Sequence, residues 1–251
     1  MSLRFASLGS GSRGNALLVE SSDTLLMVDC GLPRRVVEER LRALGRHAAH
    51  VAAVLITHEH GDHIDGIGPF QRRYGTPVWS TLGTAGSLRG LHGQRSFSCH
   101  RTLTIGAIDV QPFPVPHDAR EPCQFVFSAG GRKLGLMTDT GHVTAHIRER
   151  LLGCDALAVE ANHDLDKLHS STYPDSVKSR VGSKYGHLNN AQTAGLLEEV
   201  GHGGLQWVAG LHLSERCNSP ALVRASLEPV LNSSKLHLAA QDTPSDWLEI
   251  E

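Results

Sequence analysis

Three histidines and an aspartate, His58, His60, Asp62 and His63, lie within the short segment Thr57-His58-Glu59-His60-Gly61-Asp62-His63. This segment directly follows an apolar run at 51–56 that is typical of a buried strand. Imidazole and carboxylate groups are ligands that Zn²⁺, Mn²⁺ and Fe accept, and side chains two residues apart in a turn can converge on one ion while their neighbours serve another. The spacing therefore predicts a hydrolytic centre with two metal ions at the end of this strand.

Chance clustering is the alternative, because the chain has 16 histidines among 251 residues. Chance would scatter histidines and acids without relation to the strands. Instead, apolar runs are followed directly by residues of ligand type: Asp29, His58, His117, Asp139 and His212. Rigid strands deliver such side chains to a common edge, where a metal centre needs them. We therefore favour a metal site over accident.

Hydrophobic periodicity and turn residues predict the elements that position these side chains. Strands are predicted at 3–8, 16–20, 25–28, 51–56, 77–80, 103–105, 108–115, 124–127, 133–138, 156–160 and 207–211. Helices are predicted at 33–44, 64–74, 143–152, 174–181, 191–200 and 220–230. Runs of strands with interspersed helices favour an α/β fold, a four-layer αββα sandwich, and we expect residues 1–251 to form one domain.

Composition narrows the class of protein. No stretch approaches the ~20 apolar residues that span a bilayer, and the N-terminus has no signal-peptide pattern, so we expect a cytoplasmic protein without a membrane anchor. Five widely spaced cysteines without a CxxC motif predict reduced thiols. Nothing in the composition specifies an oligomeric state.

The net charge of −2 gives no global attraction to nucleic acid, so a polyanionic substrate must be held locally. A basic stretch between residues 34 and 46 is typical of a solvated helix face. A second stretch is the better candidate for substrate binding and contains Lys167, Lys178, Arg180 and Lys184.

The segment at 9–14 matches GxGxxG after a strand, and Asp29 lies at about the distance expected for a ribose contact. A dinucleotide site needs a helix that begins at the third glycine, but residues 15–28 hold two strands and a turn. The segment also lacks the Gly-Lys-Ser/Thr ending of a triphosphate-binding loop. We therefore exclude a nucleotide cofactor and expect this glycine turn to bring Ser10 and Asn15 to the metal edge.

Taken together, the strand-end motifs resemble those of the metallo-β-lactamase fold superfamily over nearly the whole chain. The resemblance implies one metal on His58, His60 and His117, a second on Asp62, His63 and His212, and Asp139 between the two. It also implies that Asp29 fixes the histidine loop without being a ligand. An HxHxDH cluster with a bridging aspartate resembles the dinuclear hydrolases, in which ions about 3.5–4 Å apart can hold a hydroxide that attacks a phosphodiester.

A narrower similarity, to the bacterial YycJ/WalJ group, rests on these motifs: Gly9-Ser10-Gly11-Ser12-Arg13-Gly14-Asn15, Glu160-Ala161-Asn162-His163-Asp164, Tyr173-Pro174, Gly186-His187-Leu188-Asn189-Asn190 and His212-Leu213-Ser214. That group is exonuclease-like, which implies a nuclease that acts on DNA or RNA ends. The chain departs from the pattern at Asn189, where Ser is expected, and at Cys217, where Asn is expected.

A phosphodiesterase needs a proton donor for its leaving group, and an imidazole side chain can act as that donor near neutral pH. We expect His187, or in second place His163, to supply that proton, and Asp62 to act beside the metals. Candidate substrate contacts are Ser10, Asn15, Asn162 and Lys184.

Two other functions remain open at this point. The ligand set also serves thioester hydrolases similar to glyoxalase II and enzymes that cleave small phosphodiesters. A binding protein that keeps the metals as a structural clip is a third possibility, although the complete ligand set argues against it.

Overall fold

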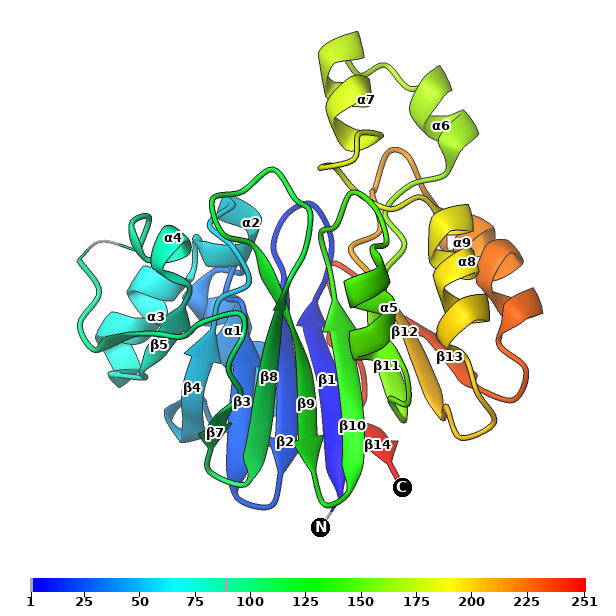
Figure 1. Ribbon diagram of the computed structural model, residues 1–251. Coiled ribbons are helices and arrows are strands. Elements are labelled where there is room, and N and C mark those ends of the chain that lie inside the picture. The colour runs from blue at the N-terminus through cyan, green and yellow to red at the C-terminus, as the bar shows by residue number, and fades with distance from the viewer. Residues whose placement is uncertain (1, 89) are drawn as a thin grey trace.

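The computed structural model describes residues 2–88 and 90–251 (Figure 1). Its strands are β1 Leu3–Gly9, β2 Ala16–Ser21, β3 Thr24–Val28, β4 Val51–Leu55, β5 Val78–Ser80, β6 Gln94–Ser96, β7 Leu103–Ile105, β8 Ile108–Pro114, β9 Cys123–Ala129, β10 Arg132–Met137, β11 Ala156–Glu160, β12 Trp207–Leu211, β13 Lys235–Leu238 and β14 Leu248–Ile250. They form two seven-stranded sheets, in the orders β14-β1-β2-β3-β4-β5-β6 and β13-β12-β11-β10-β9-β8-β7.

The α-helices are α1 Arg34–Ala43, α2 Gly61–Ile64, α3 Ile67–Tyr74, α4 Leu82–Ala85, α5 Ala145–Leu151, α6 Leu165–Ser170, α7 Asp175–Val181, α8 Asn190–Val200 and α9 Pro220–Leu227. Short 3₁₀ turns occur at Ala48–His50 and Glu228–Val230. The sheets pack face to face, with α1 and α3 outside one and α5, α8 and α9 outside the other (Figure 1). The predicted αββα sandwich is therefore confirmed.

Apolar side chains fill three layers, one between the sheets and one beneath each set of helices. Phe5, Phe125 and Phe127 are almost completely buried between the sheets. Because the central strands are covered on both faces, they appear in the sequence as nearly continuous apolar runs. Each apolar run ends where the strand leaves the core, so the sequence indicates where the strand ends.

Strand direction explains why the polar residues gather at one edge. β3 runs parallel to β4, and β10, β11 and β12 run parallel to one another. β8 and β10 are both antiparallel to β9, so β8 points the same way as β10. Within each sheet, the residues that follow these strands therefore emerge at the same edge.

The helix predicted at 64–74 is divided into α2 and α3. Gly66 lies at the division, where its N–H donates to the Cys30 carbonyl over 2.8 Å. A Cβ at this position would lie 1.9 Å from the Leu32 carbonyl oxygen, so the backbones meet too closely for any other residue. This approach fixes the histidine-bearing turn against the segment after β3.

The composition also led to predictions about the cysteines, the first basic stretch and membrane-spanning segments. All five cysteines are free and buried, as predicted. In the first basic stretch, Arg34 pairs with Glu38 and Arg46 pairs with Glu20, so these two side chains form ion pairs within the chain. No helix in the described part of the chain is long and apolar enough to cross a membrane.

Candidate metal centre

The strand-end residues meet at one edge of the sandwich, and three of them have strained backbones. Asp29, Asp139 and His212 have φ angles of 60°, 45° and 54°. Few residues other than glycine adopt this left-handed region, because it brings Cβ close to the backbone. Such strain concentrates at functional sites, where the surrounding fold imposes it.

The first group of donors consists of His58, His60 and His117, whose ligand atoms lie within 4.8 Å of one another. His60 Nδ1 lies 3.0 Å from His58 Nε2 and 3.2 Å from His117 Nε2. The remaining nitrogens of two rings are anchored: His58 Nδ1 lies 2.9 Å from Thr57 Oγ1, and His117 Nδ1 donates to the Gly186 carbonyl over 3.0 Å. Such anchors fix the tautomer and leave Nε2 free to bind a metal.

The second group consists of Asp62, His63 and His212. Asp62 Oδ2 lies 3.2 Å from His212 Nε2 and 3.5 Å from His63 Nε2. His63 Nδ1 donates to Asp29 over 2.7 Å, so its Nε2 also faces the other donors. Residues from both sheets thus converge on one small volume.

Asp139 lies between the two groups. Its Oδ2 is 2.6 Å from His63 Nε2 and 3.6 Å from His58 Nε2, and its Oδ1 is 2.8 Å from His212 Nδ1. Both oxygens are buried, yet neither accepts a well-formed hydrogen bond. A buried carboxylate without hydrogen bonds is costly unless a cation binds it. The oxygen and nitrogen donors here therefore fit divalent metal ions.

Burial and charge set the protonation of the ligands in the metal-free chain. Burial lowers the pKa of His58 and of His117, which favours the neutral imidazole that a metal needs. Burial opposes charge on His212 as well, but the Asp139 carboxylate outweighs it and raises the pKa of His212 to about 9. Protonated imidazole thus balances the buried carboxylate, and a metal cation can take over that role.

Asp29 holds the start of the histidine loop. Its Oδ1 accepts from the Thr57 backbone N–H over 2.8 Å, and its Oδ2 accepts from Thr57 Oγ1 over 2.9 Å and from His63 Nδ1 over 2.7 Å. None of the donor groups contains Asp29. The carboxylate orients two candidate ligands, His63 directly and His58 through Thr57.

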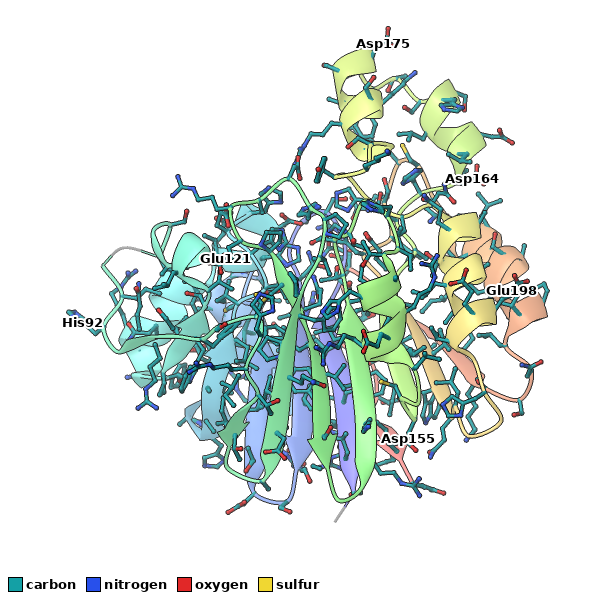
Figure 2. The ribbon with its side chains drawn as sticks, viewed as in Figure 1. His92, Glu121, Asp155, Asp164, Asp175 and Glu198 are labelled. Atoms are coloured by element: carbon teal, nitrogen blue, oxygen red, sulfur yellow. The ribbon has the colours of Figure 1, made fainter. Side chains whose placement is uncertain are left out.

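Replacing Asp29 by Asn should weaken metal affinity by roughly 10- to 100-fold, because loss of a partner that orients a ligating histidine typically costs that much. The measurement is titration of metal-stripped protein with Zn²⁺ against a competing chelator. Asp155→Asn is the matched control, since Asp155 lies far from the metal edge, towards the end of the sandwich that holds the termini (Figure 2). Equal affinities in the two variants would contradict the role of Asp29.

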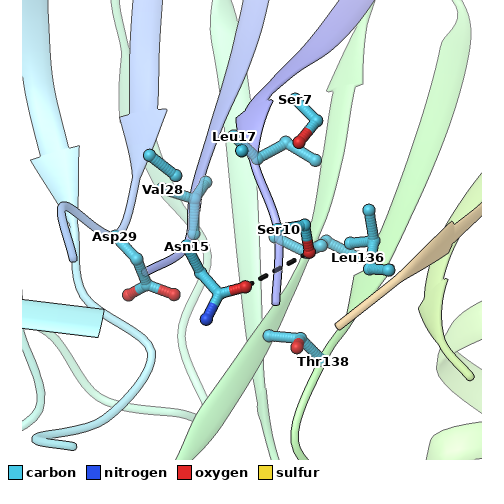
Figure 3. Close-up of a pocket in the computed structure, with 11 residues that line it drawn as sticks. Ser7, Ser10, Asn15, Leu17, Val28, Asp29, Leu136 and Thr138 are labelled. Atoms are coloured by element: carbon cyan, nitrogen blue, oxygen red, sulfur yellow. Dashed lines mark hydrogen bonds between the residues drawn. The ribbon is translucent and has the colours of Figure 1, made fainter. Parts of the chain in front are cut away.

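Ser10 and Asn15 reach the metal edge, as predicted, but both are buried. Ser10 Oγ accepts from the His212 N–H over 2.8 Å, and Asn15 Nδ2 donates to Asp62 Oδ2 over 3.2 Å. A hydrogen bond of 3.2 Å joins the two side chains (Figure 3). They border a small cavity of about 20 Å³ beneath the site and use their polar groups to hold ligands.

A larger, open cavity of about 400 Å³ gives access to the ligands. Of the predicted substrate contacts, Asn162 lines this cavity and Lys184 does not. Lys184 is exposed, and its backbone carbonyl accepts from His142 Nδ1 over 2.9 Å. Arg180, from the same basic stretch, lines the cavity instead.

The two histidines considered as proton donors occupy different positions. His187 lines the cavity, and its Nδ1 lies 3.1 Å from Asp139 Oδ1 and 3.1 Å from Glu160 Oε2. Burial disfavours charge on His187, but these two carboxylates raise its pKa to about 10. His163 is buried outside the cavity lining, and burial lowers its pKa to about 4.

In the sequence Glu160 stands out only as part of a motif, because it is the last residue of β11 and does not follow its strand as the candidate ligands follow theirs. Its side chain is completely buried and accepts from the backbone N–H groups of Thr140, over 2.6 Å, and Leu188, over 3.2 Å. Two fixed donors and the His187 ring thus compensate its charge.

Comparison with known proteins agrees with this geometry. Residues 24–207 match the family model described as a beta-lactamase superfamily domain. The chain belongs to the metallo-β-lactamase superfamily. Within it, the chain is 36% identical over 237 residues to exodeoxyribonuclease YycJ of Bacillus anthracis, covering 92% of this chain and 90% of the relative.

Exodeoxyribonuclease WalJ of Streptococcus pneumoniae is 32% identical over 233 residues, which cover 89% of this chain and 86% of that protein. Among solved structures, the metallo-β-lactamase fold protein YhfI of Bacillus subtilis superposes with a TM-score of 0.78 at 19% identity, over 99% of this chain and 100% of YhfI. The sequence relatives and the donor groups together mark this superfamily member as a metal-dependent hydrolase.

Proposed function

We propose that this superfamily member is a dinuclear phosphodiesterase, an exonuclease that acts on the ends of nucleic acid. The observation that carries the proposal is the pair of donor groups on either side of Asp139, open to one cavity. The names of the relatives YycJ and WalJ support the choice of a nucleic-acid substrate. Residues 1–251 would act as one hydrolase domain in the cytoplasm.

In this proposal His58, His60 and His117 would hold one ion, Asp62, His63 and His212 would hold the other, and Asp139 would be shared between them. Two bound divalent ions, Zn²⁺, Mn²⁺ or Fe, would supply an activated water and stabilise the charge that develops on the phosphoryl group. Asp29, Thr57 and Asn15 keep the ligand side chains oriented before substrate arrives.

His187 is the proposed proton donor. Its Nδ1 faces Asp139 and Glu160, so the protonated ring keeps the Nε2 proton for the leaving oxygen. Although burial opposes its charge, Asp139 and Glu160 raise the pKa of His187, which favours the protonated ring, whereas burial lowers the pKa of His163 and favours the neutral ring. We therefore assign the role to His187 and not to His163.

Metal-stripped protein resupplied with Mn²⁺ or with Zn²⁺ should release nucleotides stepwise from end-labelled DNA, and should cleave bis-p-nitrophenyl phosphate. Single- and double-stranded substrates, tested in parallel, would define the preferred form. Cleavage of the small ester alone would indicate a small-molecule phosphodiesterase. Turnover of an acyl thioester without cleavage of any phosphodiester would contradict the proposal.

A further inference from the structure

The segment between β11 and α8 leaves the sandwich and forms an arm, residues 164–185, above the metal edge (Figure 1). The arm contains α6 and α7, with Asp164 at its foot and Asp175 at its outer end (Figure 2). The Asp164 N–H donates to the Cys217 carbonyl over 2.8 Å, and the Tyr185 carbonyl accepts over 3.0 Å from the loop between β8 and β9. Both ends of the arm are therefore held by backbone hydrogen bonds to neighbouring loops of the sandwich.

The inner face of the arm presents apolar side chains to the cavity. Helix α7 buries none of its residues, although it contains Val177 and Val181. These two valines and Tyr173, which precedes the helix, line the cavity. The opposite wall carries the imidazole and carboxylate donors, so a ligand that fills the cavity must be apolar on one side and charged on the other.

Positive charge accompanies the apolar wall. The Arg216 guanidinium lies 5.4 Å from the centre of the Tyr173 ring, and Arg180 on α7 lines the cavity. Arg180 Nε lies 2.5 Å from Asp118 Oδ2, and Asp118 Oδ1 lies 3.4 Å from Nε2 of the adjacent residue, His117. The chain as a whole has a net charge of −2 and does not attract a polyanion. The guanidinium groups of Arg180 and Arg216 supply positive charge locally, at the cavity.

We propose that the arm binds the terminal nucleotide of the substrate, with Tyr173 stacked on the base and Arg180 against the backbone phosphate. A nucleotide presents a phosphodiester to the metal wall and a flat apolar base to the arm at the same time. Base–aromatic stacking tolerates any sequence because every base has a π-face. The inference rests on the proposed function and adds the element that selects nucleic-acid ends.

The size of the cavity agrees with a single nucleotide. Its volume of about 400 Å³ falls within the range of roughly 300–1,000 Å³ that is typical of small-ligand sites. The other tyrosine of the arm, Tyr185, is 59% exposed and does not line the cavity. It therefore provides a matched control on the same arm.

The test compares oligonucleotides that carry a base on both terminal nucleotides with otherwise identical ones whose terminal nucleotides are abasic. For the metal-loaded wild-type protein, loss of the terminal base should raise KM by roughly 10- to 100-fold, the range expected for one stacked base. Tyr173→Ala should raise KM for the base-bearing substrate to a similar extent and remove the difference between the two substrates. Tyr173→Phe and Tyr185→Ala should keep that difference.

If Tyr173→Ala, folded and loaded with metal as the wild type is, still discriminated fully between the two ends, the inference would be overturned. Binding to oligonucleotides with phosphorothioate end linkages, measured by fluorescence anisotropy, separates this result from the fate of the proposed function. Base-dependent affinity lost in Tyr173→Ala, without hydrolysis of any phosphodiester, would sustain the nucleotide site and refute the nuclease. Normal hydrolysis with no dependence on the terminal base would sustain the nuclease and refute the nucleotide site on the arm.

Discussion

Replacing Asp139 by Asn should remove both proposed metal ions and lower phosphodiester hydrolysis by roughly 1,000-fold or more, an effect expected when charge stabilisation by two metals is lost. The physical reason is its position: one carboxylate lies beside His58 of the first donor group and beside His63 and His212 of the second. Asn keeps the volume but withdraws the negative charge that both ions would share. Metal content by elemental analysis and turnover of bis-p-nitrophenyl phosphate are the two measurements.

Asp175→Asn is the control for Asp139→Asn, because Asp175 is exposed at the outer end of the arm (Figure 2). It should keep full metal content and activity. A thermal unfolding curve of each variant shows whether a loss of metal reflects a loss of fold. Retention of two ions per chain by folded Asp139→Asn would show that Asp139 does not bridge the sites.

Replacing His187 by Ala should lower kcat on DNA by roughly 100- to 10,000-fold, the usual contribution of a positioned general acid. The effect on bis-p-nitrophenyl phosphate should be much smaller, because nitrophenolate leaves without protonation whereas a sugar alkoxide does not. The difference between the two substrates is the decisive quantity. A merely structural histidine would affect both substrates equally.

The metal content of His187→Ala must be measured alongside, because His187 lies in a further group of donors with Asp139, Glu160 and His212. Loss of metal from this variant would make His187 a ligand and would contradict the role of proton donor. His163→Ala is the matched control and should keep nearly full kcat on DNA. Undiminished activity of His187→Ala on every phosphodiester would also exclude the assignment.

The sequence predicted the central strands well, but of the four edge strands it predicted only β7. Central strands are buried on both faces, so their apolar runs have sharp ends that the sequence displays. The predictions omitted α4, α6, β6, β13 and β14, which are short and lie outside the central part of the sheets. Pairing such as Leu3 with Ile250 joins opposite ends of the chain, and no local pattern encodes it.

The types of the proposed ligands and their places at strand ends were determined by the sequence alone, because metal chemistry restricts the residue types and strand periodicity restricts their positions. Only the tertiary structure decided which atoms face one another. It brought Asp139 between two groups drawn from both sheets, and it placed Arg180 and Tyr173 in the cavity and Lys184 outside it. Those positions depend on how the sheets pack and how the arm folds over their edge, which are properties of residues far apart in the chain.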